Sequence, residues 1–328
     1  IEVLRKKGEA TAVKKSGRIA AEGVVATLVE DGKAAIVEVN SETDFVAKNE
    51  KFQTFVANVV KQIVNSDAAD VEALYAEPWA LDTSKTVKDE LTSQIAVIGE
   101  NMNIRRFKKI VSDGVVVSYI HAGGKIGVLV EADAQANETV EASMKTIAMQ
   151  IAAMSPQYIS RENISDDELA KMREITIDSA LNDVASLPKP IQKDIFAEAL
   201  STDALSAEDK AILEEKQNDK YLFNFLSKEA IASLAAISMS KKEEICANKI
   251  FNGLVEGRIS KQLKEVCLLD QTYVMAADGK QTVKAYLAEV SKEVGAPVAL
   301  KSFIRFETGE GIEKKEEDFA AEVAKQMK

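Results

Sequence analysis

Residues 24–39 read VVATLVEDGKAAIVEV, and residues 116–131 read VVSYIHAGGKIGVLVE. The two stretches align without a gap at an offset of 116 − 24 = 92 residues, with Val-Val and Gly-Lys identical. Both arms of each stretch are rich in β-branched residues, and Asp31-Gly32 or Gly123-Gly124 supplies the positive φ angles that tight hairpin turns require. The sequence therefore predicts the same β-hairpin twice.

Each hairpin is expected to be followed by helix and by a third strand. Apolar residues recur at helical spacing over residues 52–63, and a second helix is predicted over about residues 85–98, before a strand at residues 103–110. After the second hairpin comes a helix over residues 144–154, but the matching strand, residues 299–306, stands near the C-terminus. This order predicts an α+β fold with two repeated small antiparallel-sheet subdomains covered by helices, the second subdomain being split by an insertion.

The insertion is predicted to be an acidic helical hairpin that projects into solvent. All 15 glycines lie outside residues 128–252, so few helix breakers occur there. Residues 160–245 contain 11 Lys and Arg against 18 Asp and Glu, which is −7 of the total charge of −11. Residues 241–258 are expected to form the returning helix, ending near Gly253 and Gly257, and Leu187-Pro-Lys-Pro190 interrupts the hairpin.

The ends of the chain are predicted to be helical. Residues 1–7 look like the end of a helix stopped by Gly8. A solvated linker is favoured over a site for an anionic surface as the interpretation of the basic residues Arg5, Lys6, Lys7, Lys14, Lys15 and Arg18. The resulting division is a helix end with its linker at 1–17, a first subdomain at 18–113, a second at 114–160 plus 262–312, the helical or coiled-coil insertion at 161–261, and a C-terminal helical arm at 313–328.

Composition excludes several classes of partner and of functional site. A net charge of −11 over 328 residues argues against nucleic acid as a partner, and no apolar run approaches the roughly 20 residues that span a bilayer. Two cysteines without a CxxC pair suit a reducing compartment, so cytoplasmic localisation is expected. The single histidine, His121, excludes a multi-His metal site, and the glycines at 123–127 are explained by the turn rather than by a phosphate cradle. We therefore expect no cofactor, no bound metal and no direct nucleotide site.

The junction after the first hairpin, residues 40–49, reads NSETDFVAKN. Thr43 or Asp44 is placed to cap the following helix through its side-chain oxygen. Phe45 precedes Phe52 by seven residues, so periodicity alone favours a core position for Phe45 over a contact with a partner.

Four blocks of the sequence resemble the bacterial elongation factor Ts family: residues 21–25 (AEGVV), 39–49 (VNSETDFVAKN), 94–101 (QIAVIGEN) and 303–314 (FIRFETGEGIEK). The resemblance covers residues 1 to about 155 and about 245 to 328 in the family's order, and it ends with DFAAEVA at residues 318–324. It implies a guanine-nucleotide exchange factor for elongation factor Tu that acts in translation without covalent chemistry. It also implies a core of two repeated subdomains with a protruding helical hairpin.

The resemblance also implies which residues touch the partner. The segment that approaches the partner's Mg²⁺ site corresponds to Thr43, Asp44, Phe45 and Val46. The turn that meets a β-barrel domain of the partner corresponds to His121, Ala122 and Gly123, with a partly buried strand histidine that makes no contact as the alternative for His121. The arm that docks on the GTP-binding domain corresponds to Phe319, Val323 and Gln326, with packing of Phe319 on the sheet as the alternative.

The chain departs from the family pattern in two places. Of the small ubiquitin-associated-like domain that opens family members, the resemblance assigns only the last helix, residues 1–7, and the insertion at about 164–245 is longer than a simple coiled-coil hairpin. A second hypothesis therefore stays open, namely a non-catalytic adaptor that recruits another protein through the acidic insertion. A third, an enzyme that uses His121 as a base, requires a nucleophile beside it that the sequence does not identify.

Overall fold

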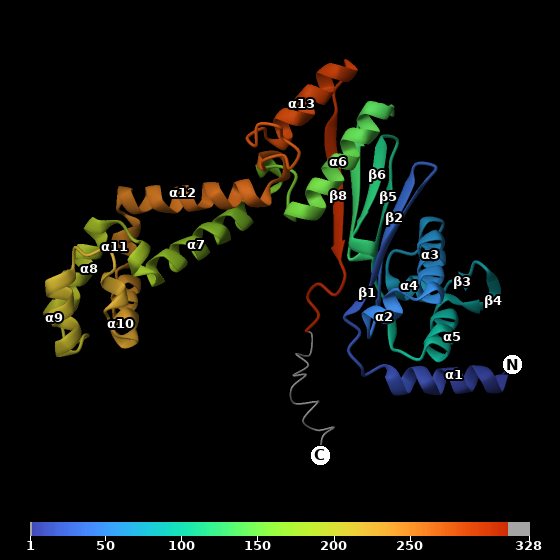
Figure 1. The fold of residues 1–328 in the computed structure, drawn as a ribbon, viewed down its shortest axis with the longest axis horizontal. Coiled ribbons are helices and arrows are strands. Elements are labelled where there is room, and N and C mark those ends of the chain that lie inside the picture. Colours follow the sequence, from blue (N-terminus) through green and yellow to red (C-terminus); the bar gives the residue numbers. More distant parts are fainter. Residues whose placement is uncertain (1, 314–328) are drawn as a thin grey trace. The chain divides into compact units, whose positions relative to one another are not determined.

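The computed structural model describes residues 2–313, and the chain falls into two compact units (Figure 1). One unit combines the chain up to Ile159 with the chain from Thr272 onward, and the other is Ser160–Gln271. The described elements of the first unit are α1 (Glu2–Lys15), β1 (Glu22–Glu30), β2 (Lys33–Ser41), α2 (Asp44–Ala47), α3 (Glu50–Val64), α4 (Val71–Ala76), β3 (Pro78–Trp79), β4 (Asp82–Thr86), α5 (Val87–Ile98), β5 (Met102–Val111), β6 (Val115–His121), η1 (Ala122–Gly124), β7 (Ile126–Asp133), α6 (Glu138–Met154), α13 (Val283–Val294) and β8 (Ala299–Glu307).

Two three-stranded antiparallel sheets form the first unit, in the orders β1-β2-β5 and β6-β7-β8. Both predicted hairpins and both predicted third strands are confirmed, and so is the α+β class. Asp31 and Gly32 make the two-residue turn of the first hairpin, with φ of 49° and 74°, as a tight hairpin turn of this kind requires. The short β3-β4 pair was not predicted, because Pro78-Trp79 is too brief to carry a pattern.

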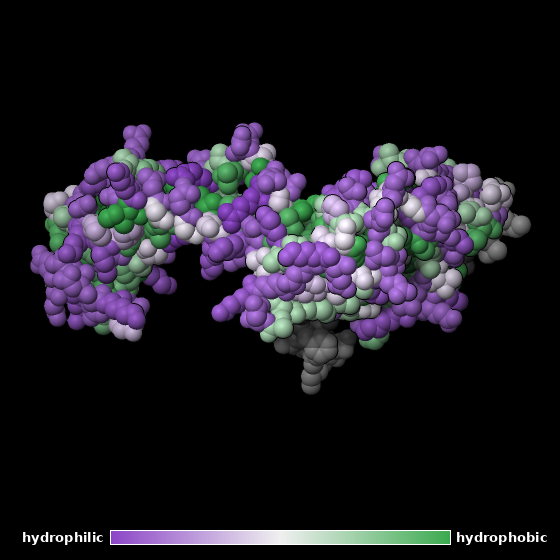
Figure 2. Space-filling model, turned by 90° about the horizontal axis from the view of Figure 1, so that it is seen from above, coloured by the Kyte–Doolittle hydropathy of each residue, from purple (hydrophilic) through white to green (hydrophobic). Residues whose placement is uncertain are grey.

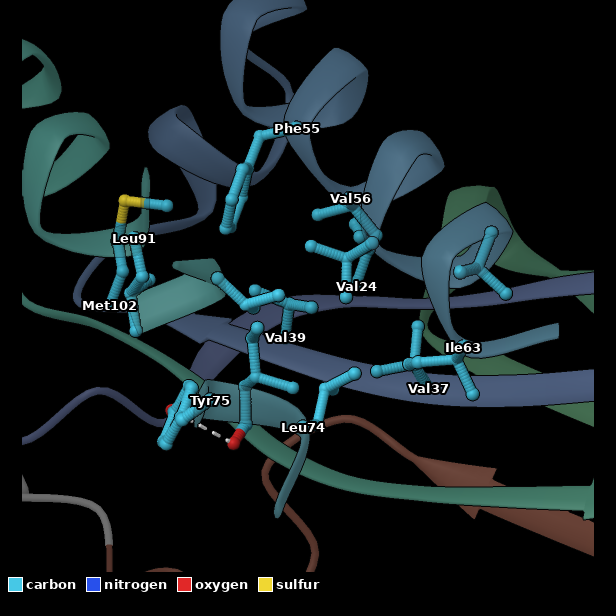
Figure 3. Packing of buried hydrophobic residues seen from close by; sticks show 14 of the residues in the cluster. Val24, Val37, Val39, Phe55, Val56, Ile63, Leu74, Tyr75, Leu91 and Met102 are labelled. Carbon is cyan, nitrogen blue, oxygen red and sulfur yellow. Dashed lines mark hydrogen bonds between the residues drawn. The ribbon is translucent and has the colours of Figure 1, made fainter. Parts of the chain in front are cut away.

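The outer face of the first sheet is covered by α3, whose apolar stripe meets the sheet (Figure 3). Val37 and Val39 of β2 are fully buried against this stripe, which includes Phe55 and Ile63. Burying a side chain of this size stabilises the fold by about 1.5–3 kcal/mol. Asn49 caps α3 by accepting a hydrogen bond from the Lys51 backbone N–H. The core of this half therefore lies between one sheet face and one amphipathic helix.

The inner faces of the two sheets pack against each other. One cluster of buried residues draws members from both sheets: Val25, Ala34, Ile36, Ile110, Leu129 and Phe306. The Arg106 guanidinium, from the first sheet, lies 4.3 Å from the centre of the Phe306 ring, in the second. The two repeats are thus joined through their sheets, and α6 covers the outer face of the second sheet (Figure 1).

The gapless alignment of the repeat is wrong by one residue on each arm. Val25 lies in the cluster between the sheets, where its counterpart is Val116, an offset of 116 − 25 = 91; Ile36 there corresponds to Leu129, an offset of 129 − 36 = 93. The second loop is longer, since His121 pairs with Ile126 whereas Glu30 pairs with Lys33. Because a slip of one residue moves a strand's side chains to the other face, only the shifted alignment gives both copies the same inner face.

The first helix extends further than predicted. It runs through Gly8 to Lys15 rather than ending at Gly8. A glycine inside a helix costs about 1 kcal/mol relative to alanine, and the packing of α1 against α5 offsets this cost. Lys14 and Lys15 are in the last turn of this helix and not in a linker, and the Lys15 ammonium donates to the Gly99 carbonyl.

The second unit is helical. Its described elements are η2 (Arg161–Asn163), α7 (Asp166–Asn182), η3 (Val184–Ser186), α8 (Lys189–Ser201), α9 (Ala207–Lys216), η4 (Leu222–Asn224), α10 (Lys228–Ser240), α11 (Lys242–Cys246), α12 (Lys249–Val266) and η5 (Leu268–Asp270). Long α7 and α12 lie side by side and the shorter helices connect them (Figure 1). The expected return helix over 241–258 is wrong in its bounds, because α12 continues through Gly253 and Gly257.

Polar side chains cover most of the face of each unit that Figure 2 shows. Among residues 2–313, no helix is both long enough and apolar enough to cross a membrane.

Candidate functional site

The site begins where β2 ends and α2 turns away from the sheet. Thr43 caps α2, with its side-chain oxygen accepting from the Val46 backbone N–H at 3.3 Å. The Thr43 backbone N–H and hydroxyl both donate to the Glu100 carboxylate, at 3.0 and 2.7 Å. Glu42 accepts from the Asn101 backbone N–H at 2.6 Å. Two carboxylate contacts therefore tie this single helical turn to the loop after α5.

Phe45 points into solvent from that turn. Its relative exposure is 81%, whereas Ala47 in the same turn is buried and Val46 packs against the core. The core position that periodicity favoured for Phe45 is wrong, because α2 and α3 are separate helices and their stripes do not join. An aromatic ring this exposed on a well-anchored turn is available to a partner.

Asp44 is half-exposed at the start of α2. Lys48 donates to its carboxylate over 2.7 Å, one helical turn further on. This hydrogen bond is the main reason that the pKa of Asp44 lies below its ordinary value, and the charges of Lys48 and Lys125 act in the same direction. Asp44 is therefore a carboxylate at neutral pH.

The second predicted contact lies at the end of β6 and on the loop that follows it. His121 is exposed, and its Nδ1 lies 3.0 Å from the Tyr119 hydroxyl, so the buried alternative for this residue is wrong. Ala122 and Gly123 follow with φ of 48° and 65°. A non-glycine residue in the left-handed region costs about 1–2 kcal/mol, and such strain gathers at functional loops.

The structure brings these two elements to the same part of the first unit. Both α2 and the η1 loop contact β1. Gly124 lies directly on this strand, where a Cβ on the glycine would stand 2.9 Å from the Val24 Cβ. Lys125, next to η1, pairs with Glu22 of β1 and contributes to the field at Asp44. The α2 turn that carries Phe45 and the η1 loop next to His121 thus lie against the same strand, β1.

The third predicted contact, Phe319 with Val323 and Gln326, lies outside the described residues. The chain before it does reach the site, since the Thr308 backbone N–H donates to the Lys125 carbonyl at 2.9 Å. Within residues 2–313, no group of three or more His, Cys, Asp or Glu side chains is placed to hold a metal ion.

Sequence reasoning missed the residues that support the site. Glu100 lies in a family motif, but its role in anchoring Thr43 was not predicted, because the contact spans 57 residues and no local pattern reveals it. Glu38 is another such residue, fully buried within the strand stretch IVEVN. A carboxylate in a run of β-branched residues is a signal that could have been read, since buried charges need partners.

Comparison with known proteins decides the family. The family model described as Elongation factor TS matches residues 42–310, a span that begins beside Thr43 and includes the His121 loop. This chain belongs to the elongation factor Ts family. Its members are translation elongation factors, and the resemblance of the four sequence blocks is confirmed.

Curated relatives agree over the whole chain. The sequence is 41% identical to elongation factor Ts of Clostridium tetani (strain Massachusetts / E88) over 331 aligned residues, which cover 100% of this chain and 88% of that protein. The proteins named elongation factor Ts from Clostridium novyi (strain NT) and from Clostridium kluyveri (strain NBRC 12016) are 42% and 43% identical, with the same coverage.

Proposed function

We propose that the protein binds elongation factor Tu in its GDP-bound form and promotes GDP release, which allows GTP to be loaded. The observation that carries the proposal is Phe45, 81% exposed on a turn that Thr43 and Glu100 hold in place. The family membership supports a role in translation elongation, and the partner follows from the resemblance of residues 39–49 to the family motif.

Release requires no covalent step. Mg²⁺ links GDP phosphates to a GTPase through oxygen ligands in a strict octahedral shell, so a small displacement of the surrounding helices weakens both ion and nucleotide. Burial of the Phe45 side chain in a pocket of the partner supplies about 1.5–3 kcal/mol, which is comparable with a local rearrangement. Asp44 places a negative charge beside the same position.

The anchored turn lowers the ordering cost of the contact between Phe45 and the partner. A side chain that must be ordered on binding consumes about 0.5–1.5 kcal/mol of the interaction energy, and Phe45 is already oriented by the capped turn beneath it. The His121 loop offers a second contact from the other sheet, and the strained backbone of Ala122 indicates that the surrounding structure holds this loop in place. Two rigid contacts from one body favour a partner conformation in which both fit.

Stopped-flow release of a fluorescent GDP from elongation factor Tu tests the proposal. Phe45→Ala should lower the stimulated release by roughly 10- to 100-fold at limiting concentrations, equivalent to the burial energy of the ring. Leu81→Ala is the matched control, since Leu81 is 68% exposed on the same subdomain but lies between β3 and β4 rather than on α2. Equal effects of the two substitutions, or unchanged release with Phe45→Ala, would reject Phe45 as the contact.

A further inference from the structure

Glu38 is a fully buried carboxylate in the central strand of the first sheet. It accepts hydrogen bonds from Asn40 Nδ2 at 3.0 Å, Arg105 Nη1 at 3.1 Å and Arg106 Nε at 2.6 Å. Its fourth partner is the Gly309 backbone N–H at 2.8 Å, which belongs to the turn after β8 of the second sheet. Removing a partner from such a group leaves an uncompensated buried charge, so the four contacts act together.

The two arginines extend the connection to the second sheet. Arg105 Nη2 donates to the Glu310 carbonyl at 2.6 Å, and Arg106 Nη2 donates to the Glu307 carbonyl at 3.1 Å. Arg106 also pairs with the Glu310 carboxylate at 3.1 Å. Glu38 therefore holds two cations in the orientation in which they bind the end of β8.

Glu131 occupies the corresponding place in the second sheet. Each glutamate stands at the register shift of its central strand, and each pairs across the sheet with the third strand, Glu38 with Arg106 and Glu131 with Ser302. Glu131 is 5% exposed and accepts from Lys301 Nζ at 2.8 Å and from the Ser302 hydroxyl at 2.7 Å.

Each of the two glutamates contacts a segment that belongs to the other sheet. Glu131 also accepts from Ser112, which follows β5 of the first sheet, just as Glu38 accepts from Gly309, which follows β8 of the second. The segments after the two third strands are anchored alike, with the Ser112 N–H donating to the Gly32 carbonyl and the Thr308 N–H donating to the Lys125 carbonyl, both at 2.9 Å. Each sheet thus contains a buried carboxylate that binds the segment after the third strand of the other sheet.

We propose that Glu38 and Glu131 are positioning residues that fix the two sheets relative to each other, so that the α2 turn and the His121 loop engage the GTPase at the same time. The proposal rests on the proposed function, in which these two elements are the contacts. Two contacts on one rigid body reinforce each other because the first raises the effective concentration of the second. If the sheets shift relative to each other, the contacts become independent.

Electron–electron double resonance between two spin labels tests the geometry without any partner. The labels replace Lys61 on α3 and Lys145 on α6, which are exposed on the two sides of the paired sheets, and they are attached through a non-natural amino acid so that the native thiols are untouched. Glu38→Gln should broaden the distance distribution. Glu90→Gln should not, because Glu90 is a buried carboxylate that pairs with Lys85 and Gln94, both within one subdomain. An unchanged width in Glu38→Gln overturns the proposal.

The GDP-release assay then tests the coupling. His121→Ala is measured in the natural, Glu38→Gln and Glu90→Gln backgrounds. Its fold-effect on kcat/KM should be smaller by roughly 5-fold or more in Glu38→Gln and unaltered in Glu90→Gln, since only coupled contacts are non-additive. A merely structural Glu38 would lower the melting temperature but leave the His121→Ala effect the same in every background, and that result overturns the proposal.

Two outcomes separate this inference from the function on which it rests. If Phe45→Ala and His121→Ala both leave GDP release unchanged, the proposed function fails, whereas the label distances still report on the sheets. If Glu38→Gln does not fold, Arg105→Lys replaces it, because lysine keeps the charge but cannot reach Glu38 and the Glu310 carbonyl together. That variant should broaden the distances and weaken the coupling in the same way, and failure to do so contradicts the proposal.

Discussion

Replacing Glu100 with glutamine should disconnect the α2 turn from the loop beneath it. The Glu100 carboxylate accepts two hydrogen bonds from Thr43, at 3.0 and 2.7 Å. Bonds to a charged group contribute about 1.5–3 kcal/mol each, but Glu100 is half-buried and glutamine keeps one acceptor, so we expect a net loss of about 1–2 kcal/mol in the anchoring of the turn. A loss of this size lowers the population of the anchored conformation of the turn, in which Phe45 is held for binding, roughly 5- to 30-fold relative to detached conformations.

The apparent affinity for the GTPase is proportional to the fraction of molecules in the anchored conformation, so it should fall as that fraction falls. KM in the GDP-release assay should therefore rise by several-fold, with the maximal rate little changed and the melting temperature nearly constant. Glu77→Gln is the matched control, since Glu77 also accepts two side-chain hydrogen bonds, from Gln62 and Ser66, but remote from α2. The reasoning is refuted if Glu100→Gln leaves KM at its natural value, or if Glu77→Gln raises KM equally.

Three further changes have outcomes that the structure specifies. Gly23→Ala should prevent stable folding of the first sheet, because a Cβ there would lie 2.1 Å from the Val39 carbonyl oxygen; a normal thermal melt would contradict this. Burial raises the pKa of Glu131, but the hydrogen bonds from Lys301, Ser302 and Ser112 outweigh burial, so the pKa lies below its ordinary value. The contribution of Glu131 to stability is therefore complete above its unfolded pKa of about 4.3, and it is lost as the pH falls through the folded pKa. Urea unfolding across this acidic range should show a shallower pH dependence for Glu131→Gln than for the natural protein, and parallel curves would reject the assignment. Phe225→Ala, which changes a ring 49% exposed in the second unit, should leave GDP release unaltered, and a large loss would favour the adaptor hypothesis.

The sequence was sufficient for the sheets because their signals are local. Alternating β-branched residues around Asp31-Gly32 specify a hairpin over a few residues, and the third strands at 103–110 and 299–306 repeat the same composition. The alignment between the copies failed because the second loop has two extra residues, which a gapless comparison hides. Matching Gly23 with Gly114 would have corrected it, since both lie against a backbone carbonyl of the central strand.

The site was less predictable because its supports are distant in sequence. Thr43 as a helix cap was foreseen from its place in the motif, and the structure confirms it. Periodicity misplaced Phe45, since it cannot tell that one helix ends at Ala47 and another begins at Glu50. The contacts of Glu100 and Glu38 join segments 57 and 271 residues away, and only the folded chain brings them together. The roles of Thr43, Asp44, Phe45 and Val46 in binding stay predictions.

The ends of helices were hard to place for a related reason. Gly8, Gly253 and Gly257 were each taken as stops, yet both helices run through them. A glycine costs about 1 kcal/mol within a helix, and packing of the rest of the helix exceeds that cost. Burial of Val255 and Ile259 on α12 is an example of such packing, which local propensity does not contain.

The central claim is that the protein fits the GTPase better once GDP and Mg²⁺ have left. Linkage requires the antagonism to be mutual: the factor by which this protein weakens GDP binding equals the factor by which GDP weakens its own binding. Isothermal titration of elongation factor Tu with this protein, once free of nucleotide and once saturated with GDP and Mg²⁺, measures the second factor directly. We predict much tighter binding to the nucleotide-free partner, and equal affinity for the two forms would contradict the account.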